Sequence, residues 1–135
     1  MEIFLAQETI LIVDDNPLNM KLVNVLLAGE GYSVRTAADA EEALAVLDKC
    51  HPQMILMDIQ LPGVDGLELT RRLKANPSTR DITIVGLTAY AMKGDEERIR
   101  SAGCDGYIPK PIDTRALPGL IKRFLNRETI TPVAN

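Results

Sequence analysis

Five short apolar runs alternate with longer segments of helical period, and this alternation most strongly constrains the fold. Several runs are apolar at every position, which is typical of strands that are covered on both faces. The runs are TILIV (9–13), YSVRTA (32–37), QMILM (53–57), ITIVGLT (82–88) and GYIPK (106–110). Five β-α units in strict alternation predict an α/β protein with a parallel sheet between two layers of helices.

The first intervening segment carries clear helix boundaries. Asn16 and Pro17 supply an N-cap and a first-turn proline for a helix that runs to about Leu27. Gly29 and Gly31 follow, and they are expected to close it.

The later segments also begin at acidic caps. Asp39, followed by Glu42 three residues later, has the pattern of a capping box. Asp65 opens a helix that should stop before Asn76-Pro77, and Asp95 opens a short helix that ends near Gly103.

The last segment is less regular. Asp113 opens it, but Pro118 lies one turn further on and has no N–H to donate. We therefore expect an irregular first turn, followed by a regular helix from about Leu117 to Asn126.

Length and composition fit one globular domain with one core, because the chain has 135 residues and is 46% hydrophobic. The net charge is -4 and no cluster of Lys and Arg stands out, so a nucleic-acid surface is not expected. No apolar run is long enough to span a bilayer, and the N-terminus lacks the basic start of a secretory signal. We expect a cytoplasmic protein without membrane insertion.

Cysteine and histidine contribute no recognisable chemistry. Cys50 and Cys104 fit no metal or redox spacing, and reduced thiols in a cytoplasmic protein are expected. His51 is the only histidine, so a zinc site or a Ser-His-Asp hydrolase is close to excluded.

The first and third apolar runs end in acidic residues. Asp14 and Asp15 follow the first run directly, and Asp58 follows the third. Ligands of open α/β sheets bind beyond the carboxyl ends of the strands, so these three carboxylates converge if the two strands are neighbours. Such a cluster would be destabilising without a divalent cation, and Mg²⁺ is the natural candidate.

The fourth and fifth runs end in Thr88 and Lys110. An aspartate can act as a nucleophile and form an acyl phosphate, and the phosphoryl oxygens then need a hydrogen bond and a cation. A threonine hydroxyl and a mobile lysine ammonium suit these two tasks. Each residue type is common alone, but the four strand ends together form a specific signal for phosphoryl chemistry.

This set of residues resembles the receiver domain of two-component response regulators. The resemblance covers residues 8–127 and leaves 1–7 and 128–135 as short terminal extensions. It rests on ILIVDDNPLNMKL, ILMDIQLPGVDGLEL, IVGLTAYAMKGD and GCDGYIPKPID. The sequence is similar to stand-alone receivers of the cell-cycle kind and to receivers of hybrid histidine kinases. The resemblance implies a flavodoxin-like, doubly wound (βα)5 three-layer sandwich with strand order 2-1-3-4-5.

The resemblance also assigns the acidic residues. It implies that Asp58 accepts a phosphoryl group from a phosphohistidine on a histidine kinase or a histidine phosphotransfer protein. Asp15, Asp58 and the backbone carbonyl of Gln60 would bind Mg²⁺ directly, and Asp14 would act through a bound water.

Further residues would respond to the phosphoryl group. Thr88 and Lys110 would bind it, and Tyr107 would turn into the space that Thr88 leaves. The surface of the fourth helix, fifth strand and fifth helix would then change for an unknown downstream partner. From the residues alone, Tyr107 is about as well explained as a packing tyrosine.

Three neighbouring residues and one peptide bond complete the implied site. Gln60, Ala89 and Tyr90 occupy positions that influence how fast the aspartyl phosphate hydrolyses, and a bulky Tyr90 would slow the approach of water. The Lys110-Pro111 bond matches a position where receivers carry a cis peptide, which proline tolerates.

Two other functions remain in competition with this interpretation. A magnesium-dependent phosphatase or phosphotransferase would share the aspartyl chemistry, but haloacid-dehalogenase-like enzymes need D-x-D at the first strand, where this chain has VDDN. An inert flavodoxin-like scaffold would keep a costly acidic cluster without using it. The short extensions favour a free-standing receiver without an output domain over a fragment of a hybrid kinase, and the oligomeric state stays open.

Overall fold

The computed structural model describes residues 8–61, 65–89 and 93–126. Strands and helices alternate without exception in this part of the chain. The elements are β1 (Thr9–Val13), α1 (Pro17–Gly29), β2 (Ser33–Ala37), α2 (Ala40–Leu47), β3 (Met54–Asp58), α3 (Gly66–Ala75), β4 (Thr83–Thr88), α4 (Lys93–Ser101), β5 (Gly106–Pro109) and α5 (Leu117–Leu125).

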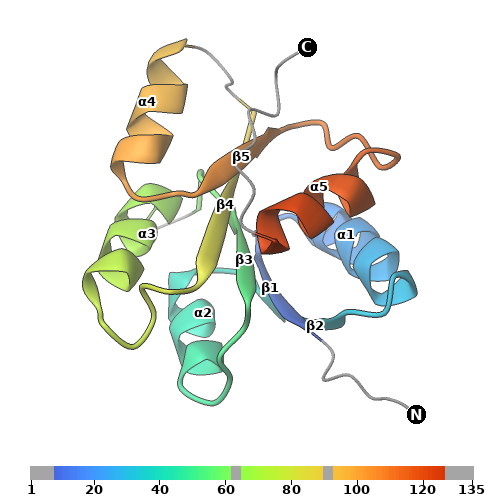
Figure 1. Cartoon of the computed structure of the whole chain (residues 1–135), viewed down its shortest axis with the longest axis horizontal. Helices are drawn as coiled ribbons and strands as arrows, with labels where there is room; N and C mark the ends of the chain where they lie inside the picture. Colours follow the sequence, from blue (N-terminus) through green and yellow to red (C-terminus); the bar gives the residue numbers. More distant parts are fainter. Residues whose placement is uncertain (1–7, 62–64, 90–92, 127–135) are drawn as a thin grey trace.

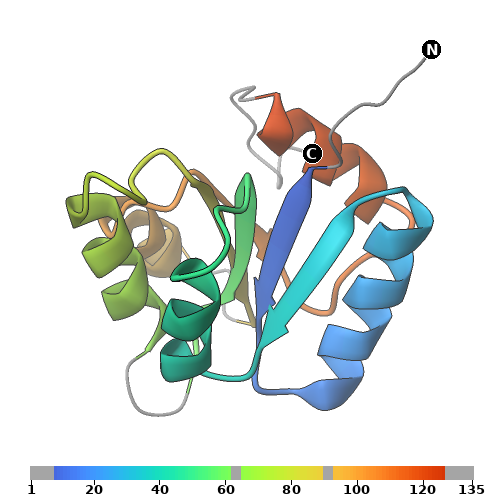
Figure 2. The ribbon, with the colours of Figure 1, turned by 90° about the horizontal axis from the view of Figure 1, so that it is seen from below.

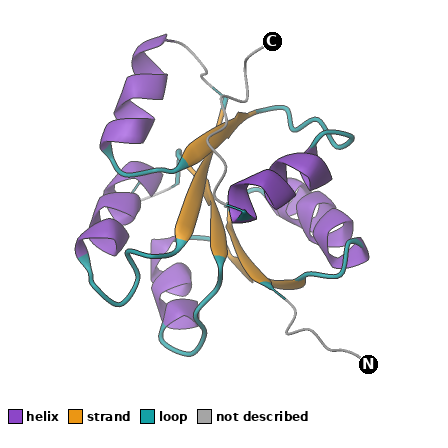
Figure 3. Ribbon diagram, in the orientation of Figure 1, coloured by secondary structure: helices purple, strands orange, loops and turns teal. Residues whose placement is uncertain are grey.

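The strands form one parallel sheet in the order β2-β1-β3-β4-β5. Helices α1 and α5 cover one face, and α2, α3 and α4 cover the other (Figures 1 and 2). Figure 3 shows the resulting three layers, with the strands between the two groups of helices. The predicted flavodoxin-like fold and its strand order are confirmed.

Both faces of the sheet are buried, which explains the continuously apolar runs. In β1, Ile10 and Ile12 pack into the core beneath α1 and α5, whereas Leu11 and Val13 pack into the core on the opposite face. All four side chains are 0% exposed. An edge strand carries a weaker pattern, and Arg35 and Thr36 of β2 are exposed.

Most of the predicted helix boundaries are confirmed by side-chain caps. The Asn16 side chain accepts from the N–H groups of Leu18 and Asn19 at 3.0 and 3.1 Å. Helix α1 continues two residues past Leu27, to Gly29, before Gly31 adopts a φ of 97°.

The second helix begins with the predicted cap in a modified form. Asp39 Oδ1 accepts from Glu42 N at 2.8 Å, as a capping box requires. The Glu42 carboxylate reaches back to Ala38 N, also at 2.8 Å, instead of the N–H of Asp39 itself.

Several predicted boundaries differ from the structure by one or two residues, and the irregular turn before the last helix was predicted correctly. Helix α4 begins at Lys93, so Asp95 lies within its first turn, where an acid interacts favourably with the helix dipole without capping. Strand β5 ends at Pro109, one residue before Lys110. Before α5, Asp113 Oδ1 accepts from Arg115 N at 3.0 Å in the expected irregular turn.

Cys50 and Cys104 are both free thiols, and Cys104 is buried. Burial is the main cause that raises the pKa of the Cys104 thiol to about 11, so this thiol stays protonated. No helix in the described part of the chain has both the length and the apolar composition that a membrane span requires.

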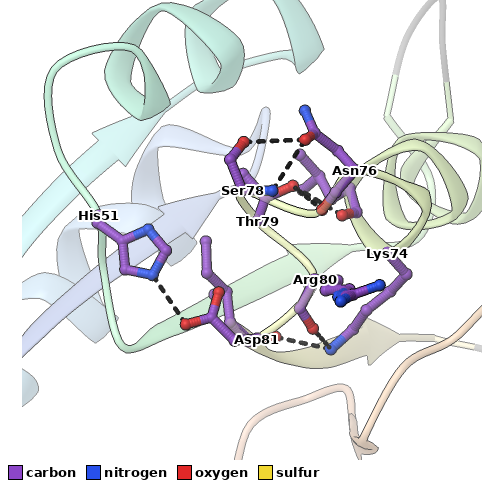
Figure 4. Close-up of polar contacts among 9 residues, drawn as sticks. His51, Lys74, Asn76, Ser78, Thr79, Arg80 and Asp81 are labelled. Atoms are coloured by element: carbon purple, nitrogen blue, oxygen red, sulfur yellow. Dashed lines mark hydrogen bonds and ion pairs between the residues drawn. The ribbon is translucent and has the colours of Figure 1, made fainter.

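At the amino edge of the sheet, the Lys74 ammonium of α3 contacts the chain that precedes β4 (Figure 4) and a carboxylate that precedes β5. It donates to the carbonyl oxygen of Ile82 at 2.7 Å, to that of Arg80 at 3.2 Å and to Asp105 Oδ2 at 3.0 Å. The same Asp105 oxygen accepts from Ile84 N at 2.8 Å. One partly buried ammonium group thus donates hydrogen bonds to two carbonyl oxygens and one carboxylate where β4 and β5 begin.

A tight polar turn follows α3 at the same edge. Thr79 Oγ1 donates to the Leu73 carbonyl at 2.7 Å, and Ser78 N donates to Asn76 Oδ1 at 3.0 Å. His51 Nε2 lies 3.2 Å from Asp81 Oδ2 across the neighbouring loop (Figure 4). The only histidine is therefore engaged at the opposite edge from the acidic residues.

We predict that Lys74→Met lowers the free energy of unfolding by about 2 kcal/mol, because it leaves the Ile82 carbonyl and the Asp105 carboxylate without their cation. Urea unfolding monitored by circular dichroism measures this change. Lys122→Met on the exposed face of α5 is the matched control and should be nearly neutral. Equal effects of the two substitutions would contradict the structural role of Lys74.

Candidate functional site

The acidic residues at the ends of β1 and β3 come together as predicted. The two strands are neighbours, and their register pairs Val13 with Met57, which brings the following residues side by side. Carboxylate oxygens of Asp14, Asp15 and Asp58 all lie within 4.8 Å of one another. Parallel strands thus gather three negative charges at the carboxyl edge of the sheet.

The three carboxylates differ in burial and in their partners. The side chains of Asp14 and Asp58 are 1% and 5% exposed, whereas Asp15 is exposed. Asp14 accepts from Asn16 N at 2.9 Å and from Asn19 Nδ2 at 3.3 Å. The start of α1 therefore orients Asp14 by both of its oxygens.

Asp58 is held by the chain that follows it. Its Oδ1 accepts from Gln60 N at 2.9 Å. Its Oδ2 lies 3.4 Å from Lys110 Nζ. One carboxylate oxygen is therefore fixed by the backbone, and the other faces a cation.

Lys110 reaches the cluster from the end of β5. Its ammonium lies 3.7 Å from Asp14 Oδ2 in addition to its contact with Asp58. Its backbone N–H donates to the Thr88 carbonyl at 2.7 Å, which ties the two strand ends together. The Lys110-Pro111 peptide bond is cis, as the resemblance implies.

The electrostatics of the cluster favour an added cation. Burial is the largest cause that raises the pKa of Asp58, and the Asp14 charge raises it further. The Gln60 N–H and the Lys110 ammonium act in the opposite direction without cancelling the effect. Three carboxylates and one ammonium sum to a charge of -2 (-3 + 1). Oxygen ligands with this charge fit a dication such as Mg²⁺.

Thr88 and Gln60 border a cavity of about 170 Å³ beside the cluster. Thr88 is 3% exposed at the end of β4, whereas Gln60 and Ala89 are exposed. Tyr90 lies outside the described residues. The cavity is lined by Ile59, Gln60, Asp65, Leu67, Thr88, Asp95, Arg98 and Ile99.

Tyr107 is buried in the core beneath α3 and α4, opposite Gly86 of β4. It is 3% exposed, and its hydroxyl donates to Glu96 Oε1 at 3.5 Å. Burial, followed by the Glu96 charge, raises the pKa of this phenol. Tyr107 therefore packs in the core, and its role as a switch stays a proposal.

Sequence reasoning missed two contacts of the site. Asn19 contacts Asp14 from inside α1, and the available signal was its position one turn after the Asn16 cap. Gly66, the first residue of α3, lies against the backbone of Asp58. The only signal of this contact in the sequence was the presence of a glycine directly after the Asp65 cap.

Comparisons with known proteins agree on one family. The family model described as "Response regulator receiver domain" matches residues 10–122. The polar-differentiation response regulator DivK of Brucella ovis is 48% identical over 118 residues, which cover 87% of this chain and 96% of that protein.

Solved structures show the same fold. The receiver domain of sensor histidine kinase PA1611 from Pseudomonas aeruginosa PAO1 has a TM-score of 0.81 at 35% identity. The match covers 90% of this chain and 99% of that domain. That structure has a magnesium ion coordinated in its active site cleft. The chemotaxis response regulator CheY4 of Vibrio cholerae has a TM-score of 0.84 at 27% identity. The match covers 88% of this chain and 99% of that one.

We predict that Asp58→Asn stabilises the metal-free protein at pH 7 by on the order of 1 kcal/mol, because it removes one of the crowded like charges. The pKa of Asp58 is raised in the folded protein, so folding favours the protonated carboxyl group. Its contribution to the free energy of unfolding is therefore fully present below about pH 4. That contribution is lost as the pH rises through the raised pKa. The advantage of the Asn variant should therefore appear above about pH 4 and level off once the pH exceeds the raised pKa of Asp58.

Urea unfolding in EDTA from pH 3.5 to 8 tests this pattern. Asp48→Asn, which removes an exposed carboxylate at the end of α2, is the control and should show no such profile. A loss of several degrees in the melting temperature of Asp58→Asn would contradict the geometry of the cluster.

Proposed function

The chain belongs to the response regulator receiver domain family, and on this premise we propose that it is a phosphorylation-switched receiver with Asp58 as the phospho-acceptor. The observation that carries the proposal is the placement of this carboxylate. It is buried among two further carboxylates, and Lys110 Nζ lies 3.4 Å from its Oδ2. A nucleophile, a cation for the phosphoryl oxygens and a set of metal ligands thus share one small site.

The reaction transfers one phosphoryl group from a phosphohistidine. The bond between phosphorus and the imidazole nitrogen breaks, a bond between phosphorus and an Asp58 carboxylate oxygen forms, and the imidazole leaves and regains a proton from water. Lys110 neutralises the phosphoryl oxygens, and the Thr88 hydroxyl donates a hydrogen bond to one of them.

The acidic cluster would hold the Mg²⁺ that this reaction needs. Asp15, Asp58 and the Gln60 backbone carbonyl would be its direct ligands, and Asp14 would act through a bound water. The ion supplies neutralisation of the negative charge on the phosphoryl oxygens. The net charge of the cluster and its all-oxygen donors support this assignment.

The partners follow from this chemistry. The donor is a histidine kinase or a histidine phosphotransfer protein in a cytoplasmic two-component system or phosphorelay. The receiver catalyses only its own phosphorylation and dephosphorylation. A downstream protein then reads the face made by α4, β5 and α5 (the α4-β5-α5 face), with no direct contact to nucleic acid and no membrane insertion.

Thr88 and Tyr107 couple the phosphoryl group to that face. Phosphorylation adds roughly -1.5 to -2 charge, which attracts the Thr88 hydroxyl toward the new oxygens. Tyr107 then moves within the space beside β4, and its ring, which packs in the core beneath α4, transmits the change. This is a biased equilibrium between two arrangements of one fold.

The lifetime of the phosphorylated state depends on residues beside Asp58 and Thr88. Gln60 and Ala89 are exposed there, so water that attacks the acyl phosphate passes them. Tyr90 is proposed to narrow this path further, and the small Ala89 leaves room for the histidine donor.

We predict that acetyl phosphate with Mg²⁺ labels one residue per chain, and that the label is stable in acid and labile in base. Asp58→Asn should abolish it, because the nucleophile is lost, whereas Asp48→Asn should label like the parent. Intact-protein mass spectrometry measures the label. Sustained turnover of assorted phosphate monoesters, with no stoichiometric label, would favour the rival interpretation as a phosphatase.

We predict that Tyr107→Ala keeps the rate of labelling within about threefold but loses most of the response of α4. The aromatic ring is needed only to report the phosphoryl group, and the cavity left behind costs about 3 kcal/mol of stability. Amide NMR shifts of residues 95–101, with and without acetyl phosphate, measure the response. Tyr107→Phe keeps the ring and is the control. A full response in Tyr107→Ala would remove this residue from the switch.

A further inference from the structure

Gly66, the first residue of α3, lies directly against the backbone at the end of β3. A Cβ at this position would lie 2.9 Å from Ile59 Cα and 3.0 Å from the carbonyl carbon of Asp58, and closer still to the Asp58 carbonyl oxygen. All three atoms belong to the main chain, so they cannot rotate aside as a flexible side chain would. Any larger residue must therefore separate α3 from β3.

The requirement for glycine here is spatial. Gly31 and Gly103 adopt φ angles of 97° and 108°, which other residues rarely tolerate. Gly66 instead has an ordinary backbone conformation inside a helix. An alanine could adopt that conformation, so the only obstacle to it is the neighbouring strand.

Hydrogen bonds clamp the same stretch of chain from two sides. Gly66 N donates to the Ile59 carbonyl at 3.0 Å, and Ile59 N donates to the Leu87 carbonyl of β4 at 3.0 Å. The buried Thr70 hydroxyl donates to the Gly66 carbonyl at 2.7 Å. The peptide that follows Asp58 is thus fixed between β4 and the first turn of α3.

This clamp acts on the groups that carry the proposed chemistry. The Asp58 carboxylate is oriented by Gln60 N, at 2.9 Å from its Oδ1, so its direction depends on the backbone that Gly66 contacts. The Gln60 carbonyl, proposed as a metal ligand, lies on the same stretch. A site of this kind tolerates displacements of only about 0.5 Å.

We propose that Gly66 is a positioning residue for phosphoryl transfer. It lets α3 approach β3 closely enough to hold the Asp58 carboxylate and the Gln60 carbonyl in their productive arrangement. Gly66 itself touches neither the metal nor the phosphoryl group. The inference rests on the proposed function, because it assumes that Asp58 binds Mg²⁺ and accepts the phosphoryl group.

The test compares Gly66→Ala with two other glycine substitutions. Calorimetric titration with Mg²⁺ gives the dissociation constant of the folded protein, and labelling by acetyl phosphate at saturating Mg²⁺ gives the rate. All variants are measured in trimethylamine N-oxide, which favours the folded state. In Gly66→Ala, we expect a dissociation constant for Mg²⁺ at least about tenfold higher and a labelling rate at least about tenfold lower.

The controls separate positioning from general loss of stability. At Gly106 a Cβ would lie 2.7 Å from Phe124 Cζ, so Gly106→Ala should destabilise the core away from the site. At Gly119 a Cβ would meet nothing within 4 Å, so Gly119→Ala should be harmless. Both controls should keep the Mg²⁺ affinity of the folded protein within about twofold of the parent.

Each outcome has a distinct meaning. A folded Gly66→Ala protein with parental Mg²⁺ affinity and labelling would overturn the positioning role. If Gly66→Ala does not fold, Thr70→Val takes its place, since it removes the hydroxyl that holds the Gly66 carbonyl. Unchanged Mg²⁺ affinity in that variant would equally overturn the proposal, and an increase in the dissociation constant of at least about threefold would support it. Failure of the parent protein to bind Mg²⁺ or to be labelled would instead overturn the proposed function.

Discussion

The close approach of three carboxylates at one edge of the sheet is the constraint around which the rest of the site is built. Their oxygens lie within 4.8 Å of one another, and two of the three side chains are almost fully buried. A single ammonium, that of Lys110, compensates them in the described part of the chain. Burial, with a smaller contribution from the Asp14 charge, raises the pKa of Asp58. The residual negative charge of the cluster favours a dication, or a phosphoryl group bound with one. The same geometry thus lowers the stability of the metal-free protein and supports the proposed phosphoryl chemistry.

The two edges of the sheet differ in how far lysine side chains compensate their acidic groups. At the amino edge, Lys74 forms an ion pair with Asp105 and also donates to the carbonyl oxygens of Arg80 and Ile82. At the carboxyl edge, the acidic residues outnumber their cation. The carboxyl edge therefore keeps an excess of negative charge, which supports the proposed binding of a dication.

Helix α3 connects these two edges. It begins at Gly66, against the backbone of Asp58, and Lys74 in its last turn joins the starts of β4 and β5. The helix is therefore anchored at the amino edge while its first turn lies against the backbone of Asp58, the proposed phospho-acceptor. This arrangement suits the proposed site, whose metal ligands would have to be held rigidly while Thr88 and Tyr107 respond to the phosphoryl group.

The sequence by itself determined the alternation of strands and helices, most helix caps and the residues at the strand ends, because these features depend on local periodicity and on hydrogen bonds within one turn. Strand order came from the resemblance, since no local pattern states which strands are neighbours. Only the tertiary structure decided that Asp14 and Asp58 are buried while Asp15 is exposed, that Tyr107 packs in the core, and that Gly66 contacts the Asp58 backbone. Distances between residues far apart in the chain depend on how both faces of the sheet pack at once, which no single segment encodes.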